Sequence, residues 1–88
     1  MPDLPLLVFT SDFLLSLGRL SSSDQRRIAR ALEQLDADET IPSLQVHQLK
    51  GKEAGVWAAY ASKSLRITFE RLEGGRKRLR EASQHYGD

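Results

Sequence analysis

Apolar residues recur every three to four positions in the first half of the chain and every second position in the second half. Residues 6–10 form a short apolar run, which predicts a buried strand. Between residues 13 and 20 the large apolar side chains follow helical spacing, and Ser11 precedes them as the expected N-cap. We therefore expect a short strand followed directly by a helix.

A second helix is predicted by the most regular periodicity in the chain. Its apolar positions at i, i+3, i+4 and i+7 are Ile28, Ala31, Leu32 and Leu35. Ser22 and Gln25 have the spacing of a capping box, in which each side chain bonds the backbone N–H of the other residue. The acidic run 36–39 would oppose the helix dipole at a C-terminus, so we expect it to form the exit loop before Pro42.

After residue 43 the period of two predicts four strands, because a strand with one buried face places every second side chain in the core. Three are expected at residues 44–49, 56–61 and 65–70, and the fourth carries the basic residues after the turn at Gly74 and Gly75. In the strand at 65–70 the apolar side chains face the core, and those pointing the other way are Arg66, Thr68 and Glu70.

The glycine turn sets the register of the last hairpin. A two-residue loop would place Leu79 opposite Glu70 on the polar face, whereas a three-residue loop places it opposite Phe69 in the core. We therefore predict a three-residue loop with a glycine in the left-handed conformation. On the polar face this register gathers Arg66, Thr68 and Arg80, with Glu70 across from Arg78.

The order β-α-α-β-β-β-β predicts an α+β fold, with a two-helix hairpin packed on one face of a mostly antiparallel, twisted sheet. Residues 1–88 are too few for two cores, so we expect a single domain. The chain has no cysteine, which excludes disulfides and cysteine-based zinc sites. The apolar stretch 4–9 is far shorter than the ~20 residues of a membrane span, and the N-terminus has no basic leader. We expect a cytoplasmic protein without a membrane partner.

Charge is distributed unevenly although the whole chain carries only +1. Residues 1–49 carry a net charge of −3, and residues 50–88 carry +4. A mixed solvated surface is the ordinary outcome of such runs, but the segregation also favours contact of the C-terminal half with a polyanion such as nucleic acid.

Both histidines of the chain, His47 and His85, fall at the ends of predicted strands. A lone histidine is usually a surface residue, yet imidazole is also the group that most readily moves protons near neutral pH. Two histidines do not form a zinc site, which takes three or four ligands. We therefore expect neither a metal ion nor another cofactor.

Two interpretations stay open for the other candidate residues. Arg66 either pairs with a neighbouring carboxylate or clamps a phosphate, whose oxygens a guanidinium binds bidentately. Tyr86 either packs the tail onto the sheet or stacks on a base. Lys50 and Lys52 are either polar turn residues or further phosphate contacts.

This succession of elements resembles the RelE/ParE superfamily of bacterial type II toxins, closest in pattern to the RelE- and YafQ-like mRNA endonucleases. The resemblance covers nearly the whole chain. It is carried by residues 43–51, by Trp57 with Tyr60, by the strand at 65–69 and by the terminal pair at 85–86. It implies a RelE-like fold and a toxin that cuts mRNA on the ribosome without a metal ion, by attack of the RNA 2′-hydroxyl on its own phosphate.

Carried over by position, the resemblance implies a catalytic set of His47, Arg66, His85 and Tyr86. It further implies RNA or phosphate contacts from Lys50, Lys52, Arg78 and Arg80. Residues 62–64 read Ser-Lys-Ser, where YafQ-like members often carry an Asp and a further His, so the assignment of acid and base stays open. The implied partners are a cognate antitoxin, in a toxin–antitoxin hetero-oligomer, and the ribosome with its mRNA.

An alternative within the same superfamily is a ParE-like, non-enzymatic toxin that binds DNA gyrase through its helices. ParE-like proteins do not need a set of imidazole and tyrosine side chains. The joint presence of His47, His85 and Tyr86 therefore favours the nuclease.

Overall fold

The computed structural model describes residues 3–51 and 54–85. Its elements in chain order are β1 (Leu7–Val8), α1 (Ser11–Gly18), α2 (Ser22–Ala37), the 3-10 turn η1 (Pro42–Leu44), β2 (His47–Gln48), β3 (Trp57–Ser62), β4 (Leu65–Arg71), the 3-10 turn η3 (Glu73–Gly75) and β5 (Lys77–Gln84). The strands of these described residues form one sheet in the order β1-β5-β4-β3-β2. Only β1 pairs with its neighbour in parallel.

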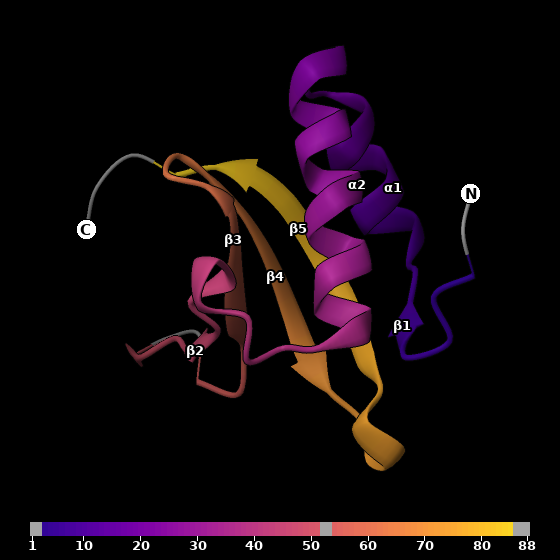
Figure 1. Cartoon of the computed structure of the whole chain (residues 1–88), viewed down its shortest axis with the longest axis vertical. Coiled ribbons are helices and arrows are strands. Elements are labelled where there is room, and N and C mark those ends of the chain that lie inside the picture. Colours follow the sequence, from indigo (N-terminus) through magenta and orange to yellow (C-terminus); the bar gives the residue numbers. More distant parts are fainter. Residues whose placement is uncertain (1–2, 52–53, 86–88) are drawn as a thin grey trace.

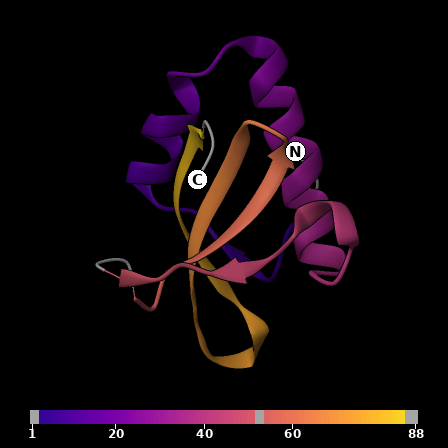
Figure 2. The same ribbon diagram turned by 90° about the vertical axis from the view of Figure 1, so that its left-hand side faces the viewer.

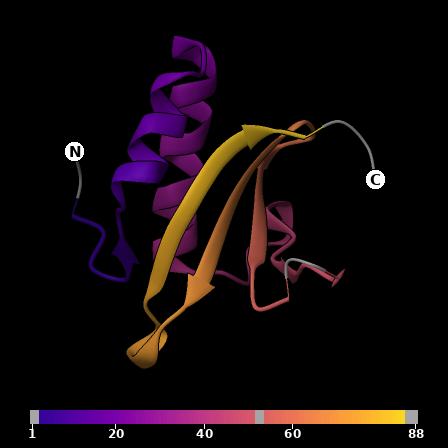
Figure 3. The same cartoon turned by 180° about the vertical axis from the view of Figure 1, so that it is seen from behind.

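The two helices lie side by side on one face of the sheet (Figure 1). The view turned by 90° looks onto the strands, with the two helices behind them and to either side, and shows β2 crossing in front (Figure 2). From behind, strands β3, β4 and β5 present a face that neither described helix covers (Figure 3). This arrangement confirms the predicted helical hairpin on one face of a mostly antiparallel sheet. Neither described helix has the length and apolar content that crossing a bilayer would take.

The core lies between the helices and the sheet. Its largest fully buried side chains are Phe13, Ile28, Leu35, Leu44, Leu65, Ile67, Phe69 and Leu79. They come from the helical stripes and the alternate strand positions that the sequence pattern predicts. Each fully buried side chain of this size stabilises the fold by about 1.5–3 kcal/mol relative to exposure.

The N-cap of each helix lies one residue before the predicted cap. Thr10 is the N-cap of α1, and its hydroxyl accepts a hydrogen bond from the backbone N–H of Phe13. Ser21 is the N-cap of α2, and its hydroxyl accepts from the N–H of Asp24. The predicted caps Ser11 and Ser22 are instead the first helical residues, because each is preceded by another hydroxyl residue that can cap.

The predicted capping box is wrong for a physical reason. The side-chain amide of Gln25 donates to the carbonyls of Leu17 and Leu20, at 3.1 Å each, rather than to an N-cap N–H. The Leu17 carbonyl lies in the last turn of α1 and the Leu20 carbonyl in the connection to α2, so this amide ties the two helices together at their junction. The exit loop also starts later than predicted, since α2 includes Asp36, whose carboxylate accepts from the N–H of Leu6 at 2.8 Å.

Strand pairing is shorter than the apolar runs at 6–10 and 44–49 suggest. The first run gives the two-residue β1, and the second starts with the last residue of η1, Leu44, and contains only the two-residue β2. Pro42 starts η1, and Gln45 ends it in the left-handed conformation with φ 45°. That turn of the backbone leaves only His47 and Gln48 in position to pair with β3.

The register of the last hairpin is the one predicted. Leu72 donates its N–H to the carbonyl of Arg76 at 2.8 Å, which closes a three-residue loop, and Phe69 pairs with Leu79. Gly74 and Gly75 have φ values of 72° and 75°, in the region that glycine adopts without steric cost.

A β-bulge interrupts β5 halfway along its length. Phe69 pairs with Leu79, but the preceding Thr68 pairs with Glu81, so Arg80 is an extra residue. The bulge turns Ala82 into the core beside Ile67. It also places a serine, rather than the alanine expected from a regular register, across from the arginine at position 66.

Helix α1 completes the outer edge of β5 where the short β1 no longer reaches. The Ser16 hydroxyl accepts from the N–H of Ala82 at 2.9 Å and donates to the carbonyl of Phe13 at 2.7 Å. The Thr10 hydroxyl donates to the carbonyl of Leu79 at 2.9 Å. These bonds satisfy edge groups that burial would otherwise leave unpaired, and they fix α1 against the strand.

Candidate functional site

The face of the sheet away from the helices, here called the open face, collects most of the predicted site residues. Cross-strand pairing places Arg66 between Tyr60 on β3 and Ser83 on β5. The neighbouring row runs from His47 through Ala58 and Thr68 to Glu81. Directly opposed side chains have their Cβ atoms about 4.5–5.5 Å apart. The two rows are therefore adjacent on this face, and Ala58 and Thr68 within the second row are themselves buried.

Three aromatic rings meet on the open face, and we call them the ring cluster: His47, Tyr60 and His85. The centroids of His47 and Tyr60 are 5.8 Å apart with 20° between the ring planes, which is a stacked arrangement. The centroids of Tyr60 and His85 are 6.2 Å apart at a tilt of 47°. Two imidazoles that lie 38 residues apart in the sequence thus flank a single phenol.

Backbone contacts position both imidazoles. The Nδ1 atom of His47 lies 2.7 Å from the carbonyl oxygen of Gln45. A carbonyl oxygen only accepts, so Nδ1 carries the hydrogen, and Nε2 of the neutral ring is the nitrogen that can take a proton. The backbone N–H of His85 donates to the carbonyl of Ser64 at 2.7 Å, which ties the end of β5 to the β3–β4 turn.

Arg66 lies half-buried beside the ring cluster. Its Nε atom is shielded from solvent and has no hydrogen-bond partner among the described residues. Arg66 forms no ion pair with a neighbouring carboxylate among the described residues, and Glu70 lies 3.6 Å from Arg78, across from it as predicted. An unpaired, desolvated donor of this kind costs about 1–3 kcal/mol, which an anionic ligand would recover.

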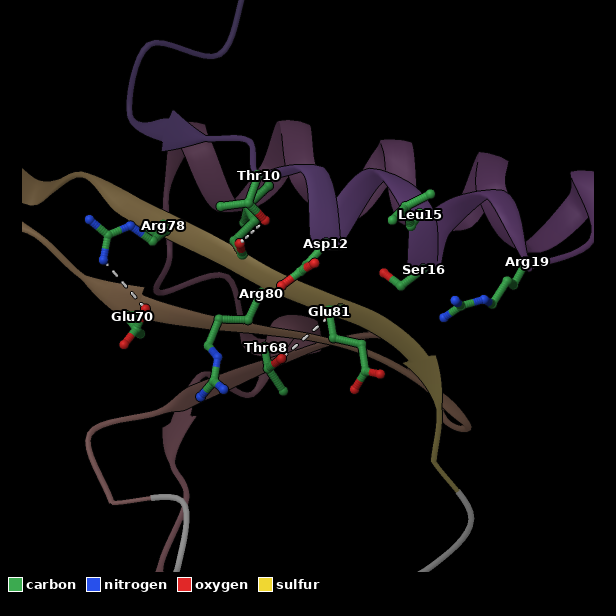
Figure 4. Close-up of a pocket in the computed structure, with 11 residues that line it drawn as sticks. Thr10, Asp12, Leu15, Ser16, Arg19, Thr68, Glu70, Arg78, Arg80 and Glu81 are labelled. Carbon is green, nitrogen blue, oxygen red and sulfur yellow. Dashed lines mark hydrogen bonds and ion pairs between the residues drawn. The ribbon is translucent and has the colours of Figure 1, made fainter.

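A hollow of about 450 Å³ lies between α1 and the open face, and we call it the α1–β5 hollow. Figure 4 shows Arg78, Arg80 and Glu81 of β5 on one side of it, and on the other Asp12 and Leu15 of α1 with Arg19, which caps the end of that helix. Thr68 forms part of its wall and lies two residues from Arg66 on the same face of β4. The hollow is therefore continuous with the surface that carries the ring cluster.

The structure brings together some of the predicted residues and separates others. The ring cluster contains His47 and His85, with Arg66 beside it, whereas Arg78 and Arg80 belong to the α1–β5 hollow. Lys50 is exposed after β2 and lines neither feature. The predicted residues Lys52 and Tyr86 lie outside the described residues.

Tyr60 is the site residue that sequence reasoning missed. The signal was present, because Trp57 and Tyr60 are separated by an odd number of positions and so point to opposite faces of β3. Trp57 packs against the core on the helix side, which leaves Tyr60 on the open face with the histidines.

A second charged group, the Glu39 cluster, lies away from the ring cluster and was not predicted. Arg71 donates to both carboxylate oxygens of Glu39, at 2.7 and 3.1 Å, and Lys77 lies 2.9 Å from the carboxylate. The bonds from Arg71, and then those from Lys77, lower the pKa of Glu39 from 4.5 to about 2. Arg71 also lies over the ring of Trp57, with its guanidinium carbon 4.1 Å from the centroid. Lys77 is only 3% exposed, so this cluster holds the fold together.

Within residues 3–51 and 54–85, no group of three or more His, Cys, Asp or Glu side chains is arranged to hold a metal ion.

No protein-family model matches this sequence, and no curated protein matches it. Several solved structures, in contrast, are similar to this chain. The YoeB/ParE toxin from Agrobacterium tumefaciens superimposes with a TM-score of 0.70 at 19% identity, over 91% of this chain and 98% of that one. YafQ from E. coli strain BL21(DE3) gives a TM-score of 0.71 at 13% identity, over 89% and 90%.

A chain of the E. coli DinJ-YafQ toxin-antitoxin complex gives 0.68 at 14% identity, over 90% of each chain. These identities are low while the coverage is nearly complete, so the likeness is one of architecture. It agrees with the two helices on a mixed sheet described above. The chain has the fold of the RelE/ParE toxin superfamily.

Proposed function

We propose that this protein is the toxin of a type II toxin–antitoxin module and acts in the cytoplasm as a ribosome-dependent mRNA endonuclease. The observation that carries the proposal is the ring cluster beside Arg66 on the open face. Proton-transfer groups and a desolvated guanidinium on one surface are the chemical requirements of phosphodiester cleavage.

In this mechanism the RNA 2′-oxygen attacks the adjacent phosphorus while its proton passes to a base. The bond from phosphorus to the 5′-oxygen breaks, and an acid protonates that oxygen. The products are a 2′,3′-cyclic phosphate and a 5′-hydroxyl end, with no metal ion assigned to any step. Arg66 binds the phosphate and stabilises the added negative charge, because its Nε lacks an acceptor that a phosphate oxygen supplies.

The ring cluster supplies the proton transfers. Nε2 of neutral His47 is the candidate proton acceptor, since Nδ1 is occupied by the Gln45 carbonyl. His85 and the hydroxyl of Tyr60 are the candidates for the acid that serves the leaving oxygen, and Tyr86 remains proposed as a further contact. The ribosome holds the message in line for attack, which is a contribution that positioning alone makes large.

Cleavage is expected to require the 2′-hydroxyl at the cut site. Purified protein is incubated with ribosomes programmed with an mRNA, and the new ends are mapped. A message with one 2′-deoxy sugar at the mapped site should resist cleavage there, while the same substitution two codons away should change nothing. Efficient cutting of the deoxy site would contradict attack by the internal hydroxyl.

The gyrase-binding alternative makes a different prediction in the same preparation. A ParE-like toxin would inhibit gyrase supercoiling and leave programmed mRNA intact. We favour the nuclease because the ring cluster and Arg66 have no task in a purely helix-mediated contact.

We further propose that the cognate antitoxin covers the α1–β5 hollow. Leu14 and Leu15 of α1 are 52% and 62% exposed, and Leu15 forms part of the wall of the hollow. Arg80 lies on the opposite wall and makes no ion pair among the described residues. An apolar edge beside the unpaired Arg80 fits an amphipathic segment that places a carboxylate at this arginine and folds on binding.

Antitoxin binding should weaken with salt, because exposed charge pairs are screened over about 8–10 Å at physiological ionic strength. Arg80→Ala should weaken binding and reduce the salt dependence, whereas Arg30→Ala, an exposed arginine of α2, serves as the control for loss of one charge. The measurement is a titration of the toxin with the product of its neighbouring gene at several salt concentrations. An affinity that ignores both salt and Arg80 would place the antitoxin elsewhere.

A further inference from the structure

A second hollow, here called the β3-edge hollow, adjoins the ring cluster. It has a volume of about 490 Å³ and is lined by Gln34, Ser43, Gln45, Tyr60, Ser62 and Lys63. It exists because β2 pairs only with Trp57 and Ala58, so the later residues of β3 have no strand beside them on that side. Helix α2 and η1 both contact β3, and Gln34 of α2 and Ser43 of η1 line the remaining walls.

The polar side chains of this hollow have no partners within the described protein. Gln34, Ser43, Gln45, Ser62 and Lys63 make no side-chain hydrogen bond or ion pair with another described residue. Two amides, two hydroxyls and an ammonium group therefore line one space without protein partners, and the side chains of Ser43, Gln45 and Lys63 are open to solvent. No carboxylate lines it, so its electrostatic preference is for an anionic ligand.

Gln45 provides an independent observation. Its backbone is left-handed, with φ 45° and ψ 49°, which glycine adopts without steric cost and glutamine does not. The backbone carbonyl that this conformation directs at His47 would be equally available from glycine. The glutamine side chain is thus held at a strained position in the wall of the hollow, and such strain is typical of ligand-contacting sites.

Tyr60 connects the β3-edge hollow to the ring cluster and to Arg66. It lines the hollow and also stacks on His47, and it lies directly across the sheet from Arg66. A nucleotide whose phosphate contacts Arg66 therefore has its neighbouring base within reach of the β3-edge hollow. Single-stranded RNA is read in this manner, by aromatic contact and by hydrogen bonds to base edges.

We propose that the β3-edge hollow binds one nucleobase next to the scissile phosphate and selects its identity. The amides of Gln45 and Gln34 read the edge of the base, each offering a donor and an acceptor, and Lys63 contacts the adjoining backbone phosphate. This inference rests on the proposed function for its substrate class, RNA, and extends it to sequence preference at one position.

The test uses RNA tetramers that cannot be cut, because they carry 2′-deoxy sugars, and that differ in a single base. Binding is followed by NMR through the side-chain amide signals of Gln34 and by titration affinity. We expect the four tetramers to differ in affinity by about tenfold, as a pair of base-edge hydrogen bonds would give. The variant Gln45→Gly should reduce that difference to less than about twofold. It should also retain the Nδ1 hydrogen of His47 and be no less stable.

The matched control is Gln48→Ala, an exposed glutamine of β2 outside the hollow, which should keep the full base preference. Equal affinities in the wild type, or a preference that survives Gln45→Gly, would overturn the proposal. Because the tetramers are not cut, this result is independent of nuclease activity. Base-selective binding by a protein that leaves programmed mRNA intact would refute the nuclease and keep the base pocket.

Discussion

Arg66→Ala is expected to lower the rate of mRNA cleavage by about 10²–10³-fold, the usual effect of removing one preorganised charge from a phosphate site. The loss should come with little change in stability, less than ~1 kcal/mol, because the side chain points away from the core and its Nε makes no hydrogen bond among the described residues. The measurements are single-turnover cleavage on programmed ribosomes and urea unfolding of the same preparation.

Two further variants separate charge from geometry. Arg66→Lys keeps the charge but loses the planar fork, so it should recover only part of the activity. Arg30→Ala removes the same charge from the exposed surface of α2 and should cleave like the wild type. Full toxicity in a double variant of Arg66→Ala and His85→Ala would exclude the nuclease and favour the gyrase target.

Glu39→Gln is expected to destabilise the fold by about 2–3 kcal/mol at neutral pH. The change leaves Lys77, which is 3% exposed, without its carboxylate partner. Breaking a fully buried pair costs about 3–5 kcal/mol, and the estimate is lower here because the Glu39 side chain is 32% exposed. In a domain of this size the loss corresponds to a fall in Tm of roughly 10 °C or more.

This stabilisation should disappear in acid. The folded pKa of Glu39 is depressed to about 2, below the ordinary value of 4.5 that applies to the unfolded chain. Its contribution is therefore complete above pH 4.5, declines as the pH falls through that window, and is lost near pH 2. The stability difference between the wild type and Glu39→Gln should shrink over the same range.

The control for this experiment is Glu33→Gln, an exposed carboxylate of α2, which should change the unfolding free energy by less than ~0.5 kcal/mol. Urea unfolding of the three proteins between pH 2.5 and 7 gives the comparison. A difference between wild type and Glu39→Gln that stays constant with pH would show that packing, rather than ion pairing, makes the contribution.

The sequence predicted those parts of the fold that depend on local pattern. The apolar stripe of α2 and the alternation of β4 directly predict which side chains are buried. The preference of the Leu79 side chain for the core was enough to select the hairpin register. The helix caps were misplaced by one residue, because Thr10 and Ser21 cap as well as the serines that follow them. No local pattern distinguishes two adjacent hydroxyl residues.

What could not be predicted depends on contacts between distant segments. The parallel pairing of β1 with β5 joins residues about 70 positions apart, and the bond from Ser16 to the N–H of Ala82 follows from it. The ring cluster required the register of β2 against β3, which a two-residue strand does not specify. The Glu39 cluster likewise joins a loop acid to two cations more than 30 residues away, a pairing that no local pattern indicates.

The extra residue at Arg80 has a consequence for how this strand can vary in length. Leu79 and Ala82 are an odd number of positions apart and yet both face the helices, which a regular strand forbids. The bulge divides β5 into two segments. In the first segment the glycine loop sets which side chains face the helices. In the second segment the hydrogen bond from the His85 N–H to the Ser64 carbonyl does so. The bulge can accommodate the insertion or deletion of a residue nearby, so that the side chains of neither segment change from one face of the sheet to the other. The basic surface and the imidazole at the strand end can therefore diverge independently in evolution.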